Sequence, residues 1–161
     1  MTDDQRAQAV DAVLNSLVGR WEGVARTWFE GEDPVDESPI RGMFRRIGDS
    51  RFVLYEYQGA FQGSPLSGAA IYGYNQQSDS FEGAWADSFH MTTNIMVSSG
   101  AAGAAGIDVL GSYSVEGGPT WGWRTEIARD GADRLILTSY NRIPEVGEFR
   151  AIEIVYARVA G

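Results

Sequence analysis

From about Trp21 to the C-terminus, short segments of strand-like residues recur at intervals of roughly 10 to 15 residues, with turn-forming residues between them. Strands in an unbroken up-and-down series tend to close into a barrel, because closure removes the exposed edges of the sheet. A barrel of this size can hold one small ligand. The pattern therefore predicts an all-β, antiparallel up-and-down barrel, and it names neither a ligand nor a reaction.

Ten strands are predicted after residue 19. Glycine, proline and acidic residues separate them, as at Gly48-Asp49, Gly63-Ser64-Pro65 and Asp130-Gly131, which is typical of tight turns. The predicted strands are Arg20–Glu30, Ser38–Ile47, Arg51–Phe61, Leu66–Tyr74, Ser80–Asp87, Thr92–Ser98, Ile107–Val115, Thr120–Arg129, Arg134–Asn141 and Glu148–Val159.

One helix is predicted before the strands, over residues 5–18. Its apolar residues fall on one face at i, i+3, i+4, i+7 and i+8 spacing, from Val10 to Val18. Thr2 and Gln5 have the spacing of a capping box, and Gly19 is placed to end the helix. A helix with one apolar stripe must pack on something, and we expect it to cover one mouth of the barrel.

The chain of 161 residues is predicted to be a single domain, with a helical segment at 1–19 and the barrel at 20–159. The sequence shows no linker and no second domain. Residues Gly100–Gly106 are the one low-complexity segment, and their alternating glycine and alanine predict a mobile loop.

Composition excludes several classes of function. The net charge of −9 argues against nucleic acid and against anionic membranes, because both are bound by clustered Lys and Arg. The absence of cysteine excludes disulfides, thiolate metal sites and thiol nucleophiles. The polar N-terminus lacks the features of a signal peptide, and no apolar run reaches membrane-spanning length, so a cytoplasmic protein is expected.

Several motifs along the chain carry a family resemblance. Gly19-Arg20-Trp21 resembles the Gly-x-Trp opening of lipocalin-like (calycin) barrels. A longer series is more specific, and it includes Phe52–Gly59, Leu66–Gly68, Gly73–Asn75, Phe81–Ser88, Trp123–Thr125, Tyr140 and Ile152–Arg158. In order and spacing, residues 15 to 158 resemble a bacterial domain family of unknown function that has a lipocalin-like barrel.

This resemblance implies a ten-stranded calycin barrel with an internal cavity, and it supplies no function. A related barrel family binds haem through a histidine on its last strand. The last predicted strand here, Glu148–Val159, contains no histidine. We therefore expect no haem and no other cofactor.

His90 is the only histidine of the chain, near the end of a predicted strand. It can be read as a general base or a haem ligand, and also as an isolated histidine in a turn or on the barrel rim. Metal sites in proteins usually combine two or three ligands of suitable type, and the sequence shows no HxH or HExxH pair. No metal site is expected. The sequence also lacks a nucleophile elbow and a phosphate-binding loop.

Charged residues inside predicted strands are the candidate polar anchors. Glu56, Asp87, Arg124 and Glu153 are included among the predicted ligand-binding residues, because an inward charge is costly unless it is paired or functional. The orientation of the eighth predicted strand, Thr120–Arg129, can be read in two ways. Hydrophobicity would bury its tryptophan face and expose Arg124 and Glu126. The family pattern suggests that Arg124 and Glu126 face inward instead. The sequence leaves this open.

Aromatic residues make up 12% of the chain, more than a minimal core needs. Ligand pockets are mostly apolar with a few polar groups, so an aromatic-lined cavity is expected. Trp85 and Asp87 are two residues apart and share a strand face, and they are the pair predicted to line the cavity. Tyr140 completes the predicted ligand-binding set.

The leading hypothesis is a small-molecule binding protein that takes a hydrophobic, aromatic or acidic ligand, with Arg124 favouring a carboxylate. The alternative is a barrel enzyme of decarboxylase or isomerase type. In it Arg124 would hold a carboxylate, Tyr140 or Tyr57 would donate a proton, and Glu56 or Glu153 would act as acid or base. A third reading is a filled, non-catalytic barrel that binds a partner protein. A homodimer is compatible with each, and no sequence feature demands one.

Overall fold

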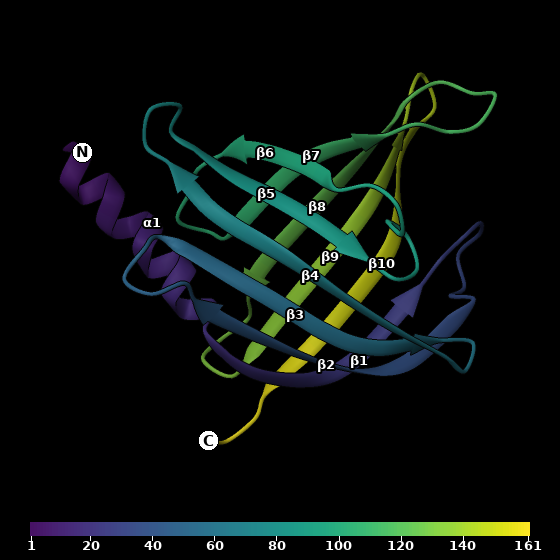
Figure 1. Ribbon diagram of the computed structural model, residues 1–161, viewed down its shortest axis with the longest axis horizontal. Coiled ribbons are helices and arrows are strands. Elements are labelled where there is room, and N and C mark those ends of the chain that lie inside the picture. The colour runs from purple at the N-terminus through teal and green to yellow at the C-terminus, as the bar shows by residue number, and fades with distance from the viewer.

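The computed structural model describes residues 1–161, and ten antiparallel strands in it form a closed barrel with one helix at one end (Figure 1). Each strand pairs with its neighbours in sequence, and the first strand closes the barrel against the last. This confirms the predicted fold. The strands are β1 (Gly19–Thr27), β2 (Asp36–Arg46), β3 (Phe52–Phe61), β4 (Ser64–Asn75), β5 (Ser80–Asp87), β6 (Met96–Ala101), β7 (Ile107–Tyr113), β8 (Trp121–Arg129), β9 (Arg134–Ile143) and β10 (Gly147–Arg158).

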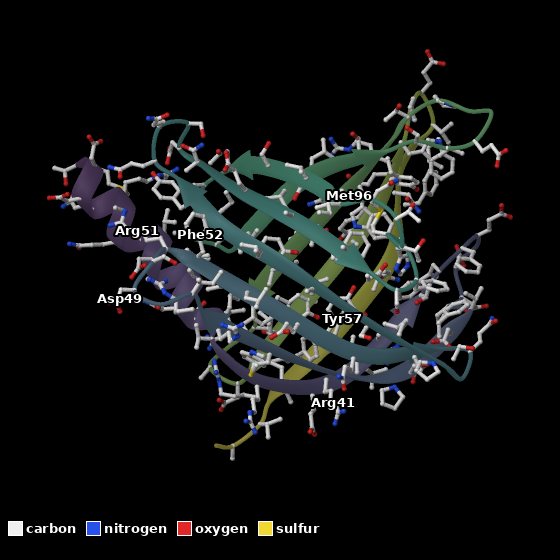
Figure 2. The ribbon with its side chains drawn as sticks, in the orientation of Figure 1. Arg41, Asp49, Arg51, Phe52, Tyr57 and Met96 are labelled. Carbon is white, nitrogen blue, oxygen red and sulfur yellow. The ribbon has the colours of Figure 1, made fainter.

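The helix α1 (Asp3–Leu17) lies across one end of the barrel, as predicted (Figure 1). Its N-terminus carries the predicted capping box, in which Thr2 and Gln5 satisfy each other's backbone N–H groups. Its buried face consists of Ala7, Val10, Val13, Leu14 and Leu17. Asp49 and Arg51, in the turn between β2 and β3, lie beside the helix at this covered end (Figure 2).

The helix ends differently from the prediction. Gly19 is not a left-handed cap; it begins β1 with φ +140°, and a Cβ there would lie 2.5 Å from Nη1 of Arg158. That guanidinium donates hydrogen bonds to the last helical carbonyls, at 2.8 Å to Val18 O and 3.2 Å to Ser16 O. A side chain from β10 therefore satisfies groups that a glycine cap would otherwise satisfy.

Trp21 seals the barrel beneath the helix. Its side chain is fully buried, and its Nε1 donates a hydrogen bond of 2.8 Å to Leu17 O. The Arg158 guanidinium lies over the indole ring at 4.2 Å from the centroid, a cation–π distance. This end of the barrel is thus filled by side chains and is closed to ligands.

The turn between β3 and β4 is shorter than predicted. It consists of Gln62 and Gly63, which both have positive φ (48° and 81°), as a two-residue type I′ hairpin turn requires. Ser64 and Pro65 already belong to β4, where Pro65 lies opposite Ala60. The proline therefore begins a strand and does not form the turn.

The low-complexity segment is only in part a loop. Gly100 and Ala101 extend β6, and the strand begins at Met96 instead of Thr92. At Gly100 a Cβ would lie 1.9 Å from the carbonyl oxygen of Asp108, so only glycine permits this approach of β6 to β7. Glycine in this segment serves close packing as well as chain reversal, and the predicted loop is wrong for residues 100 and 101.

The apolar interior is unevenly distributed along the barrel. The larger group of buried side chains connects α1 with the covered half of the barrel, and a smaller group around Met91, Met96 and Trp123 lies in the other half. Between them the inward side chains leave space. The one helix of the chain is too short and too polar to cross a membrane.

Candidate functional site

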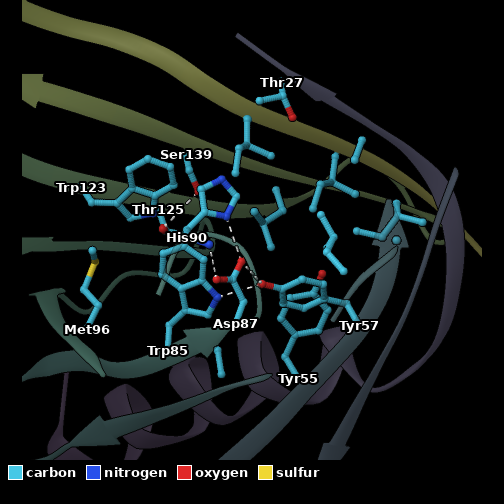
Figure 3. Close-up of a pocket in the computed structure, with 18 of the residues that line it drawn as sticks. Thr27, Tyr55, Tyr57, Trp85, Asp87, His90, Met96, Trp123, Thr125 and Ser139 are labelled. Atoms are coloured by element: carbon cyan, nitrogen blue, oxygen red, sulfur yellow. Dashed lines mark hydrogen bonds and ion pairs between the residues drawn. The ribbon is translucent and has the colours of Figure 1, made fainter. Parts of the chain in front are cut away.

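A cavity occupies the barrel interior on the side away from α1 (Figure 3). Its water-accessible volume is about 80 Å³, and 15 of its 22 lining residues are hydrophobic. Five of the lining side chains are large aromatic ones: Tyr55, Tyr57, Tyr72, Trp85 and Trp123. A water molecule occupies roughly 10–15 Å³ on this measure, so the space suits several non-hydrogen atoms.

An outer chamber of about 170 Å³ adjoins this cavity toward the open end of the barrel. Trp85, His90 and Trp123 line both chambers, so they stand between the inner and the outer space. Trp85 and Trp123 are stacked, with ring centroids 5.7 Å apart and an interplanar angle of 15°. The two chambers together can accommodate a planar ligand of one or two rings.

Asp87 is the most heavily hydrogen-bonded side chain of the cavity. Its side chain is only 1% exposed. Oδ1 accepts backbone N–H groups from Phe89 (3.2 Å), His90 (2.5 Å) and Met91 (2.7 Å). Oδ2 lies 2.8 Å from Nδ1 of His90 and accepts the hydroxyl of Tyr57 at 3.2 Å. The last residue of β5 thereby fixes the loop that follows it.

These contacts also determine the charge of Asp87. Burial by itself would raise the pKa of this carboxyl, but the hydrogen bonds from His90 and from the backbone of Met91 outweigh it. The pKa of Asp87 therefore lies below its ordinary value, and the group is ionised near neutral pH. It is the only carboxylate that lines the cavity, and no arginine or lysine lines it.

Tyr57 joins Asp87 to the tryptophan wall. Its hydroxyl accepts Nε1 of Trp85 at 2.9 Å while it donates to Asp87. Burial, together with the charge of Asp87, raises the pKa of Tyr57 and keeps the hydroxyl protonated. Gly68 lies between them on β4, opposite both Tyr57 and Asp87, and a Cβ there would lie 2.3 Å from the Tyr57 hydroxyl. The absence of a side chain at Gly68 is what allows the contact.

Two further tyrosines contribute hydroxyl groups to the interior. The hydroxyls of Tyr55 and Tyr156 are 2.7 Å apart and hydrogen-bond to each other, and burial raises the pKa of both. Tyr72 also has a raised pKa because of burial, and its hydroxyl has no hydrogen-bond partner in the protein. The polar atoms of this wall are neutral hydroxyls.

His90 lies in the wall between the two chambers, and its ring contacts Asp87 as well as three aromatic rings. The ring centroids of Phe89, Trp85 and Trp123 lie 4.5, 5.6 and 5.8 Å from that of His90. The isolated-turn reading correctly placed His90 in the segment after β5 but missed its contact with Asp87. The Asp-x-x-His spacing was the signal available in the sequence.

The structure separates the predicted site residues into two groups. Trp85 and Asp87 line the cavity together, on the shared face of β5. The other four predicted residues do not line it and lie on the outer surface of the barrel: Glu56, Arg124, Tyr140 and Glu153. Glu56 forms an exposed ion pair with Arg45.

Arg124 is the centre of an ion network on the outer face. It contacts Asp108, Glu126 and Glu148 at 2.9 to 3.2 Å, and its guanidinium lies 4.4 Å from the ring centroid of Tyr140. Trp123 and Ile127 on the same strand are buried. The hydrophobicity argument for β8 was therefore right, and the orientation suggested by the family pattern was wrong.

A β-bulge decides the orientation of Glu153. The register of β10 against β9 shifts between Arg150 and Ile152, so Ala151 and Ile154 are both buried. Simple alternation along the strand would put Ala151 and Glu153 on one face. The bulge breaks that alternation and turns Glu153 outward, where it pairs with Arg26 and Arg150.

The open end of the barrel carries an apolar rim. Phe29 and Phe89 lie in the connections that follow β1 and β5, and Phe61 is the last residue of β3; their rings form a row with centroid separations of 5.5 and 4.7 Å. Phe29 is 64% exposed and Phe89 is 38% exposed. The rim lies beside the outer chamber, which Phe29 also lines.

Comparisons with known proteins agree on the architecture. Residues 6–158 match the model of a family described as "Protein of unknown function (DUF1579)". No curated protein matches the chain.

Two solved structures of similar fold match nearly the whole length of this chain. Rv2717c from M. tuberculosis has a TM-score of 0.64 at 16% sequence identity, and the match covers 94% of this chain and 98% of that one. The S-type phycobiliprotein lyase CPES from Guillardia theta has a TM-score of 0.59 at 10% identity, covering 100% and 99%. At these identities the similarity establishes a shared calycin-like barrel.

Proposed function

The chain belongs to the DUF1579 family of unknown function, and we propose that it binds a small, uncharged, aromatic or apolar molecule inside the barrel. The observation that carries this proposal is the cavity, which aromatic side chains line, in a barrel whose other end α1 covers. A barrel interior that was packed with side chains would support a different role, because a packed core has no room for a ligand.

The charges of the cavity favour a neutral ligand over an acidic one. Arg124, the residue expected to hold a carboxylate, lies on the outer surface, and the cavity wall holds one carboxylate and no cation. A carboxylate ligand would be desolvated next to Asp87 without a counter-charge, which is costly. The hypothesis of an acidic ligand therefore has no cationic side chain in the cavity to support it.

The same placement removes the basis for the decarboxylase or isomerase alternative. That reaction would need Arg124 and either Glu56 or Glu153 in the lumen, and these side chains form ion pairs on the outside. We therefore propose binding and no reaction.

The fold comparisons support a ligand-binding role in a general way. One of the two similar structures is an S-type phycobiliprotein lyase, so a barrel of this fold serves a lyase elsewhere. The rim of Phe29, Phe61 and Phe89 offers an apolar surface that a hydrophobic ligand would meet first on its way to the outer chamber.

A matched pair of substitutions tests the proposal. Ala70 is 2% exposed and lines the cavity, whereas its neighbour Ala69 is exposed on the opposite face of β4. Ala70→Leu should fill the cavity, and Ala69→Leu should leave it open. Native mass spectrometry of freshly purified protein should show a non-covalent adduct in the wild type and in Ala69→Leu but not in Ala70→Leu.

Binding of added naphthalene and indole, measured by calorimetry, repeats the test for a ligand that is lost during purification. An adduct or probe affinity that Ala70→Leu leaves unchanged would place the binding site elsewhere and contradict the proposal.

A further inference from the structure

The hydrogen bonds around Asp87 determine which nitrogen of His90 carries a proton. An ionised carboxylate can only accept hydrogen bonds, so the atom 2.8 Å from Oδ2, Nδ1 of His90, is the donor. In the neutral ring the other nitrogen, Nε2, then presents a lone pair. Nε2 makes no hydrogen bond to any protein group, although the ring lines both chambers.

Most of the polar atoms in contact with Asp87 and the stacked tryptophans are already engaged, whereas the hydroxyls of Thr27, Tyr72 and Ser98 line the cavity without a hydrogen-bond partner in the protein. The Nε1 donor of Trp85 is used by Tyr57, and the Tyr57 hydroxyl is used by Asp87. The hydroxyls of Thr125 and Ser139 lie 3.3 Å apart and bond to each other. The Asp87 carboxylate accepts five hydrogen bonds and has almost no exposed surface. His90 Nε2 is thus a free acceptor beside the stacked tryptophans.

We propose that Nε2 of His90 is the acceptor that selects the ligand, and that the ligand is an uncharged planar aromatic molecule with an N–H or O–H donor, such as an indole or a phenol. This inference rests on the proposed binding function and deepens it. The planar shape follows from the flat walls of Trp85 and Trp123, and the donor follows from the lone pair. Asp87 acts as a positioning residue that fixes the tautomer of His90.

A first test needs no ligand. The chain has a single histidine, so ¹⁵N NMR of labelled protein reports its tautomer without ambiguity. We expect the proton on Nδ1 in the wild type. Asp87→Asn keeps an oxygen for the three backbone N–H groups and turns an NH₂ donor toward His90, so the proton should move to Nε2. A wild-type ring with its proton on Nε2 would overturn the inference.

A second test uses three bicyclic probes of nearly equal shape: indole, which has an N–H donor; benzofuran, which has none; and benzoxazole, which has a nitrogen acceptor. By calorimetry the wild type should bind indole about three- to tenfold more tightly than benzofuran, the range expected for one hydrogen bond. His90→Phe, which retains an aromatic ring without nitrogen, should bind the two equally. In Asp87→Asn benzoxazole should become the preferred probe.

The outcomes distinguish this inference from the proposed function. Equal affinities for the three probes in the wild type, or an indole preference that survives in His90→Phe, would overturn the role of His90 and leave cavity binding intact. Failure of all three probes to bind, together with a wild type that carries no adduct, would overturn both.

Discussion

Replacement of Gly68 by alanine should disrupt the contact between Tyr57 and Asp87, because Gly68 lies opposite both residues on the strand between them. The new Cβ would lie 2.3 Å from Cζ and from the hydroxyl oxygen of Tyr57, and 2.7 Å from Cβ of Asp87. Ordinary contacts begin near 3.4 Å, so the Tyr57 ring must move by about 1.1 Å, the difference between 3.4 and 2.3 Å. The hydrogen bonds of Tyr57 with Trp85 and Asp87, at 2.9 and 3.2 Å, would not survive that shift together.

The expected cost combines two effects. Overpacking of a close-packed interior costs about 1–3 kcal/mol, and one lost hydrogen bond to a charged group costs about 1.5–3 kcal/mol. Alanine also reduces the conformational entropy of the unfolded chain, which offsets about 0.4–1 kcal/mol of this cost. We expect Gly68→Ala to lower the free energy of unfolding by about 2–4 kcal/mol and to weaken binding of indole.

Urea unfolding followed by tryptophan fluorescence measures this change. Gly103→Ala is the matched control, since a Cβ at Gly103 meets nothing within 4 Å, and its effect should stay within about 0.5 kcal/mol. In a Tyr57→Leu background the cost of Gly68→Ala should fall by at least about 1 kcal/mol, because the side chain in conflict is gone. A cost equal to that of Gly103→Ala, or one that Tyr57→Leu does not change, would refute the reasoning.

Three further predictions concern the outer network, the buried carboxylate and the covered end. Arg124→Ala should lower the free energy of unfolding by about 1–2 kcal/mol, because its side chain is only 18% exposed among three carboxylates, yet leave the affinity for indole unchanged in calorimetry. The pKa of Asp87 is lowered in the folded state, so its contribution to stability is present above about pH 4, the unfolded pKa, and is lost as the pH falls through the folded pKa. Urea unfolding at pH 7, 4 and 2.5 should show a shallower acid loss in Asp87→Asn than in the wild type, and parallel curves would contradict this. Arg158→Ala should cost about 1–3 kcal/mol in the same assay, because it leaves the carbonyl of Val18 without its donor and the carbonyl of Ser16 with Arg129 alone, whereas Arg134→Ala, which removes an exposed ion pair, should cost under about 1 kcal/mol.

The position of the charged residues shows where prediction from the sequence failed. Arg124 and Glu126 alternate with buried Trp123 and Ile127, and elementary alternation placed them outside correctly. Glu153 could not be placed in this way, because the bulge between Arg150 and Ile152 changes the phase of β10 and has no clear signal in the sequence. The family pattern was misleading because it records which residues recur and not which way they face.

The Phe29, Phe61 and Phe89 rim illustrates a related limit. Phe29 and Phe89 lie in two different connections and Phe61 ends β3, and nothing in the local sequence of any one of them indicates the other two. Their rings meet only because up-and-down closure brings alternate connections to the same end of the barrel. A surface that a ligand would meet first is thus assembled from segments distant in sequence.

The features that could be predicted from the amino-acid order alone are local: the capping box of α1, the apolar stripe of that helix, the alternation of ten strands, and the shared face of Trp85 and Asp87. These follow from the interactions of residues a few positions apart, which the periods of helix and strand make readable. Only the folded barrel shows that Tyr57, Gly68 and Asp87 lie side by side on β3, β4 and β5, and that Arg124 does not join them. Such contacts depend on the register and closure of the barrel, and no local preference specifies which residues 20 or 30 positions apart will face each other.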